Sequence, residues 1–209
     1  SDINEATIRV LTRNGHNVTI PQGQTCCGAL HVHAGDRETG RKLAKQNIEA
    51  FKDASVVIVN AAGCGSMLKE YPELFREDPE WREKAEEFSA KVRDIAEYLF
   101  DTGYEKPKSE MRCRVTYHDA CHLAHGQGIR REPRQILSGI PGVELVEMPN
   151  ADRCCGSAGV YNITHPEMAG AVLESKMKNV PADVEMISMG NPGCMLQMAL
   201  GVKKYGGNQ

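Results

Sequence analysis

Two stretches of the sequence place adjacent cysteines before a glycine. The first is "TCCGALHV" at residues 25–32, and the second is "RCCGSAGV" at residues 153–160. Neighbouring cysteines rarely bond to each other, because the small ring that results strains the peptide bond between them. Thiolates are soft ligands that suit iron–sulfur clusters and zinc. The repeated pairs therefore favour metal binding over a disulfide scaffold.

The spacing of the cysteines indicates that one unit is written twice. Each pair is followed by a distant Gly-Cys, at Cys64 in the first copy and at Cys194 in the second. The interval is 37 residues from Cys27 to Cys64 and 39 residues from Cys155 to Cys194. Such self-similarity is typical of a duplicated structural unit.

The second copy contains a cysteine that the first lacks. The segment "CRVTYHDAC" at residues 113–121 ends on Cys121, which lies 33 residues before Cys154. The same interval counted back from Cys26 falls before the first residue. We therefore expect a fragment whose first unit has lost its opening strand and cysteine. Cys113 is out of register with the repeat, and we interpret it as a small buried apolar residue.

Alternating helices and strands must position these cysteines. A helix and then a buried strand are expected after each pair, at residues 36–51, 55–64, 166–179 and 184–194. This order predicts an α/β fold of two similar small layered units with parallel sheets, related by a pseudo-twofold. The first unit, incomplete, would span residues 1–105, and the second, complete, residues 106–209.

The segments around the cysteines carry further expectations. A strand should lead into each Cys-Cys pair, and helices should begin just after Cys64, Cys121 and Cys194, where their N–H groups favour thiolates. Ligands gather at the carboxyl ends of parallel strands, so the cysteines should converge. Asp78 as N-cap, Pro79 and an apolar stripe predict one connecting helix over residues 79–100.

The composition excludes several classes of protein. A hydrophobic content of 41% with 25% charged residues is ordinary for a globular protein. The net charge of −3 leaves no basic surface for nucleic acid. The longest apolar runs, such as residues 54–59, are too short to span a bilayer. We expect a cytoplasmic protein without a transmembrane segment, which its partners can hold at the inner face of the membrane.

The order Cys, Cys-Cys-Gly, Gly-Cys resembles the cysteine-rich CCG domain found in heterodisulfide reductase, in the lactate utilisation iron-sulfur protein and in the glycolate oxidase iron-sulfur subunit. The segments "CCGALHVHAG" at 26–35 and "HDACHLAHGQGIRREPRQIL" at 118–137 are most similar to the C-terminal region of the last. This resemblance implies part of the electron-transfer subunit of a flavin-dependent 2-hydroxyacid dehydrogenase acting on glycolate or lactate. The implied partners are a flavoprotein subunit and an upstream ferredoxin-like region, and the fragment itself would have no complete active site.

The resemblance also implies a ligand set. In the second unit the ligands are Cys121, Cys154, Cys155 and Cys194. Four thiolates suit an iron–sulfur cluster such as 4Fe-4S, with tetrahedral zinc as the alternative. The first unit offers Cys26, Cys27 and Cys64, and we expect this incomplete site to be empty or disordered unless a histidine completes it.

Two other functions remain open. One is a thiol or disulfide reductase module of the heterodisulfide reductase type, which uses a fifth thiolate from a final Cys-x-x-Cys. Met67 and Gln197 stand at the corresponding positions, which disfavours it. The other is a structural zinc-binding interaction module without a redox role.

Histidines accompany the cysteines in both units. Four of them follow a cysteine closely: His31, His33, His122 and His125. They can ligate a metal, lie near a cofactor or form hydrogen bonds in loops, and the sequence leaves these alternatives open. His118 and Asp119 close the strand before Cys121, where Asp119 is expected to cap the next helix.

Overall fold

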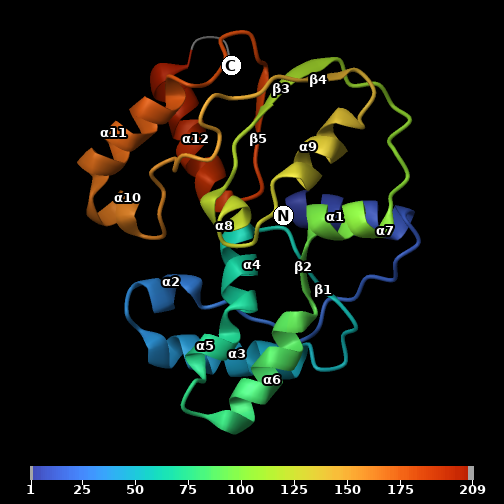
Figure 1. The fold of residues 1–209 in the computed structure, drawn as a ribbon, viewed down its shortest axis with the longest axis vertical. Coiled ribbons are helices and arrows are strands. Elements are labelled where there is room, and N and C mark those ends of the chain that lie inside the picture. The colour runs from blue at the N-terminus through green and yellow to red at the C-terminus, as the bar shows by residue number, and fades with distance from the viewer. Residues whose placement is uncertain (1, 207–209) are drawn as a thin grey trace. The chain divides into compact units, whose positions relative to one another are not determined.

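The computed structural model describes residues 2–206 (Figure 1). The chain divides between Glu105 and Lys106 into two compact units. Each unit contains a small parallel sheet surrounded by helices. The α/β class expected from the sequence is therefore confirmed, and the pseudo-twofold relation between the units stays a prediction.

Unit 1 is built around a two-stranded sheet. Its strands are β1 (Val57–Val59) and β2 (Val92–Asp94), which pair in parallel. Its helices are α1 (Asp2–Arg13), α2 (Ala29–His33), α3 (Arg37–Ala50), α4 (Ala62–Lys69), α5 (Tyr71–Leu74), α6 (Pro79–Ala90) and α7 (Ile95–Thr102). The core holds three fully buried aromatic rings, those of Tyr71, Phe75 and Phe88. These rings lie in one apolar cluster with Val57 of β1 and Val92 of β2, and their burial stabilises the unit.

The single connecting helix predicted over residues 79–100 is wrong. The segment forms α6, then β2, then α7. Val92 is completely buried and pairs with Val57 of β1, so pairing within the sheet outweighs the helical pattern. A new N-cap at Asp94 then starts α7. The Asp94 side chain accepts a hydrogen bond from the backbone N–H of Ala96, and the Glu97 side chain accepts one from the backbone N–H of Asp94, which completes a capping box. The expected N-cap at Asp78 is confirmed.

Unit 2 has a three-stranded parallel sheet in the order β4-β3-β5. The strands are β3 (Cys113–Tyr117), β4 (Val143–Leu145) and β5 (Met186–Ser188). The helices are α8 (Cys121–Ala124), α9 (Arg131–Ser138), α10 (Tyr161–Thr164), α11 (Pro166–Met177) and α12 (Pro192–Tyr205). In Figure 1, α11 and α12 lie together to one side of this sheet. Central β3 is the most buried strand, with Val115 and Thr116 fully inaccessible.

The strand expected before the first Cys-Cys pair is absent from the described residues. β4 precedes the second pair, whereas residues 16–25 form no strand. The difference follows from pairing, because β4 is held by hydrogen bonds to β3. The described part of unit 1 contains only β1 and β2, so it offers no counterpart of this β3–β4 pair.

Candidate metal centre

The three strands of unit 2 deliver its cysteines to one edge of the sheet. Cys121 is the first residue of α8, shortly after β3, and Cys194 lies in the first turn of α12, after β5. Cys154 and Cys155 occupy the loop that follows β4. Because the carboxyl ends of parallel strands meet at one edge, the four predicted ligands converge. The sequence predicted that helices begin just after Cys121 and Cys194. Instead, α8 begins at Cys121 itself and α12 begins before Cys194.

A glycine-dependent turn holds the Cys154-Cys155 pair. Gly156 has φ +93°, a left-handed conformation that favours glycine, and a Cβ there would lie only 2.6 Å from the carbonyl oxygen of Ala169. The backbone N–H of Gly156 donates to the Cys154 sulfur at 3.3 Å. The Cys-Cys-Gly motif therefore lets the loop approach α11 closely and orients one sulfur.

The four cysteines range from the interior to the surface. Cys155 and Cys194 are 1% and 4% exposed, Cys121 is half-buried and Cys154 is exposed. Hydrogen bonding to Cys121 lowers the pKa of Cys154, and hydrogen bonding to Cys155 lowers the pKa of Cys194. Hydrogen bonding to Cys154 raises the pKa of Cys121 and of Cys155, and hydrogen bonding to Cys194 also raises the pKa of Cys155, since the thiols of Cys121 and Cys155 supply the protons. The thiols thus form one connected set in which two ionise readily.

Positive and polar groups support ionised sulfur at this site. Lys176 is 2% exposed, and its ammonium donates to the carbonyl oxygens of Asn150 and Ala151 at 2.9 and 2.8 Å. Burial lowers the pKa of Lys176 to about 8, and electrostatic interaction with Cys155 and with the carboxylates of Asp119 and Asp152 opposes this shift. The Asn191 amide donates to the Cys194 sulfur at 3.4 Å. These groups offset the negative charge of the thiolates.

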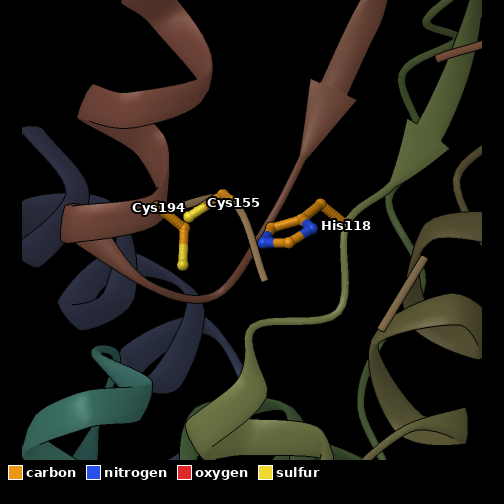
Figure 2. Close-up of side chains that lie close together, drawn as sticks. All are labelled: His118, Cys155 and Cys194. Atoms are coloured by element: carbon orange, nitrogen blue, oxygen red, sulfur yellow. The ribbon is translucent and has the colours of Figure 1, made fainter. Parts of the chain in front are cut away.

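His118 joins the buried side of the cysteine set, which the sequence did not reveal. One ring nitrogen and the sulfurs of Cys155 and Cys194 all lie within 4.8 Å of one another. Figure 2 shows the ring directed from the segment after β3 toward the two cysteines. The sequence feature that could have indicated this role is the position of His118, three residues before Cys121 and just after β3.

Asp119 does not cap α8, contrary to expectation. The N-cap residue is Ala120, with no side-chain hydrogen bond. Asp119 is instead buried and accepts two hydrogen bonds from the Arg134 guanidinium, at 2.7 and 2.8 Å. This bidentate ion pair joins the end of β3 to α9.

Unit 1 arranges its three cysteines in a similar local pattern. The N–H of Gly28, at φ +81°, donates to the Cys26 sulfur at 3.5 Å. Hydrogen bonding to Cys64 and burial raise the pKa of Cys27, and the contact with Cys27 lowers the pKa of Cys64. Buried Asn47 and Tyr71 donate to the backbone carbonyls of Cys26 and Cys27 at 3.1 and 3.0 Å, which fixes the pair. The roles of Asn47 and Tyr71 were not predicted from the sequence.

Among the remaining candidates, His122 contacts one of these cysteines. His31 contacts Asp36, His33 is exposed, and His125 contacts Arg130. His122 lies 3.7 Å from the Cys121 sulfur and is half-buried. Cys113 is half-buried at the start of β3, the opposite end of the strand from Cys121.

The positions of a possible fifth thiolate are filled by packing side chains. Met67 is buried in the core of unit 1. Gln197 is 5% exposed, lies beside Gly156 and accepts a hydrogen bond from Asn162 at 3.3 Å. Neither side chain supplies the thiolate that a five-cysteine site requires.

Sequence comparison places these features in a known class. The cysteine-rich domain family CCG matches residues 1–69 and 115–199, and the chain belongs to this family. Over 208 residues it is 46% identical to the probable glycolate oxidase iron-sulfur subunit of Bacillus subtilis, covering 97% of this chain and 47% of that protein. It is 32% identical to lactate utilization protein A of Oceanobacillus iheyensis, covering 99% of this chain and 85% of that protein.

The matches cover different shares of the relatives' lengths. The chain spans about half the length of the Bacillus subtilis relative. Lactate utilization protein A of Geobacillus kaustophilus is 31% identical over 99% of this chain and 87% of its own length. None of the helices within residues 2–206 is long and apolar enough to cross a membrane.

Proposed function

We propose that unit 2 binds an iron–sulfur cluster through Cys121, Cys154, Cys155 and Cys194. The observation that carries this proposal is the convergence of four thiols from the carboxyl ends of three parallel strands, in a connected set with two readily ionised sulfurs. Thiolates are the usual ligands of such clusters. Membership of the cysteine-rich family and the similarity to a probable glycolate oxidase iron-sulfur subunit support the same conclusion.

The surroundings fit a bound anionic group. Buried Lys176 interacts electrostatically with Cys155 and Cys154, and the Asn191 amide donates to the Cys194 sulfur. A bound cluster would accept and release single electrons. The chain's own contribution is to fix the thiolates and to keep Cys155 and Cys194 away from water.

We further propose that the chain is the cysteine-rich part of the electron-transfer subunit of a flavin-dependent glycolate or lactate dehydrogenase. Its partners would be the flavoprotein subunit that oxidises the 2-hydroxyacid and a ferredoxin-like region that carries further clusters. The support is the 46% identity to the probable glycolate oxidase iron-sulfur subunit and the resemblance to lactate utilization protein A. Unit 1, with Cys26, Cys27 and Cys64, would hold metal weakly or not at all.

Structural zinc is the second candidate. Four thiolates also form a closed tetrahedral zinc site, and the burial of Cys155 and Cys194 suits a centre that supports folding. On this alternative the chain has no redox role of its own.

The deciding measurement is iron, zinc and acid-labile sulfide per chain in protein purified without oxygen. Iron and sulfide in comparable amounts support the cluster, and zinc alone at about one per chain supports the structural site. Cys155→Ser should abolish the metal content of unit 2, because the hydroxyl is a poor soft ligand. Cys113→Ser is the matched control and should keep it, since Cys113 lies at the other end of β3. Equal metal content in both variants would refute the ligand assignment.

A further inference from the structure

His118 is a buried polar side chain whose ring faces cysteine sulfurs. It is 1% exposed, and within the described residues its ring nitrogens make no hydrogen bond of good geometry, only a weak hydrogen-bonding contact with the Cys194 thiol. A buried polar group whose hydrogen bonding is incomplete destabilises a folded protein. Native proteins keep such groups rarely, and an ion bound at the site is one of the recognised reasons.

The backbone around His118 holds the ring in a fixed place. The His118 N–H donates to the Ser188 carbonyl of β5 at 2.9 Å. The next N–H, of Asp119, donates to the Ala151 carbonyl at 3.1 Å, in the loop that leads to the Cys-Cys pair. Both neighbouring segments therefore hold the residue at the edge where the cysteines meet, before any ligand binds.

The ring faces two buried sulfurs. One imidazole nitrogen and the sulfurs of Cys155 and Cys194 lie within 4.8 Å of one another, and all three residues are buried (Figure 2). Imidazole nitrogen and thiolate sulfur are both ligands of iron and zinc. The separation leaves room for an ion between them. No other group of three histidine, cysteine or carboxylate ligands in the described residues meets the same spacing.

We infer that His118 ligates the metal centre of unit 2 together with Cys155 and Cys194, which makes the centre a mixed nitrogen and sulfur site. This inference rests on the proposed function, because it requires that unit 2 binds metal. Cys154 and Cys121 lie on the exposed side, and since the set with His118 has five donors, a four-ligand centre would use His118 in place of one of these two cysteines. A neutral nitrogen ligand also limits the negative charge that the buried side must hold, and in iron–sulfur centres histidine ligation raises the reduction potential.

The test is a direct search for a histidine nitrogen on the metal in the full chain. If iron is bound, the reduced protein is prepared with ¹⁵N-histidine and with natural histidine, and nitrogen couplings are measured by pulsed electron paramagnetic resonance. If zinc is bound, X-ray absorption at the zinc edge detects the multiple scattering of an imidazole ligand. The expected results are a coupling that changes with the isotope, or an imidazole signature at zinc.

The variants separate ligation from a structural role. His118→Gln should lose the nitrogen signal and release metal to a chelator about tenfold faster or more, by analogy with the effect of altered ligand shells. His125→Gln, an exposed histidine that contacts Arg130, is the control and should keep both. The isotope comparison needs only wild-type protein. It therefore tests the inference even if His118→Gln fails to fold.

The outcomes are distinct. Bound metal without a histidine signal in wild-type protein would overturn the role of His118 and leave the proposed function standing. A signal that persists in His118→Gln would assign the nitrogen to another histidine and also overturn the inference. Protein that binds no metal under anaerobic conditions would overturn both proposals.

Discussion

We predict that an alanine at Gly156 destabilises unit 2. Replacing this glycine by alanine adds a single Cβ in the turn that carries Cys154 and Cys155. The residue has φ +93°, and the new atom would lie 2.6 Å from the backbone oxygen of Ala169 in α11. A backbone carbonyl within a helix cannot rotate away, so the loop or the helix must shift.

Two costs contribute to the expected loss of stability. Holding a residue with a Cβ in a left-handed conformation costs roughly 1–2 kcal/mol. Overpacking against the helix costs roughly 1–3 kcal/mol more. Gly156→Ala should therefore lower the free energy of unfolding of unit 2 by about 2–5 kcal/mol, a large share of the 5–15 kcal/mol typical of a whole domain.

Gly170→Ala is the matched control, because Gly170 lies in α11 itself. A Cβ at Gly170 meets no atom within 4 Å. The substitution should stabilise the helix by about 1 kcal/mol, since alanine has the higher helix propensity. The same chemical change in the same unit thus has opposite expected signs.

Urea unfolding of the metal-free protein, followed by far-ultraviolet circular dichroism, measures both effects. Tryptophan fluorescence is unsuitable, because Trp81 is the only tryptophan in the sequence and lies in unit 1. Equal unfolding midpoints for Gly156→Ala and wild type would refute the reasoning that the turn requires glycine.

Two further predictions concern buried carboxylates. Burial raises the pKa of Asp94 from 3.8 to about 6, so the folded state binds its proton more tightly and stability falls as pH rises from about 4 to about 6. Asp94→Asn keeps a capping acceptor and should be more stable than wild type by roughly 1–3 kcal/mol at pH 7, with the difference vanishing near pH 4 in thermal melts. A constant difference between the two pH values would contradict this. Arg134→Leu should lower the free energy of unfolding of unit 2 by about 2–4 kcal/mol in urea, because it leaves buried Asp119 without its partner. The stability of Arg134→Lys should lie between that of the leucine variant and that of wild type. A leucine variant as stable as wild type would show that Asp119 finds another partner.

The cysteine set was predictable from the sequence because it depends on simple geometry. Repeated spacing identifies the unit, and parallel strands bring their carboxyl ends together regardless of loop detail. Cys121, the Cys154-Cys155 pair and Cys194 each follow a different strand of the β4-β3-β5 sheet. No side-chain contact had to be known in advance to expect their convergence.

The features that the sequence did not reveal depend on contacts between distant segments. The apolar stripe across residues 79–100 is compatible with one helix, and only pairing of Val92 with Val57 makes part of it a strand. The local clue was Asp94 followed three residues later by Glu97, a capping box inside the supposed helix. The approach of His118 to Cys155 likewise follows from the sheet, which no local pattern encodes.

The two contacts of α11 with the cysteine loop limit how this helix can vary in length. Ala169 lies against Gly156, and Lys176 reaches the carbonyls of Asn150 and Ala151. These helical residues are seven apart, or about two turns, so they share one face. Inserting or deleting one residue between them would swing the ammonium by about 100° around the helix axis, away from the loop. Related chains should therefore vary in length outside this stretch, and the register of α11 should be kept together with the Cys-Cys-Gly turn.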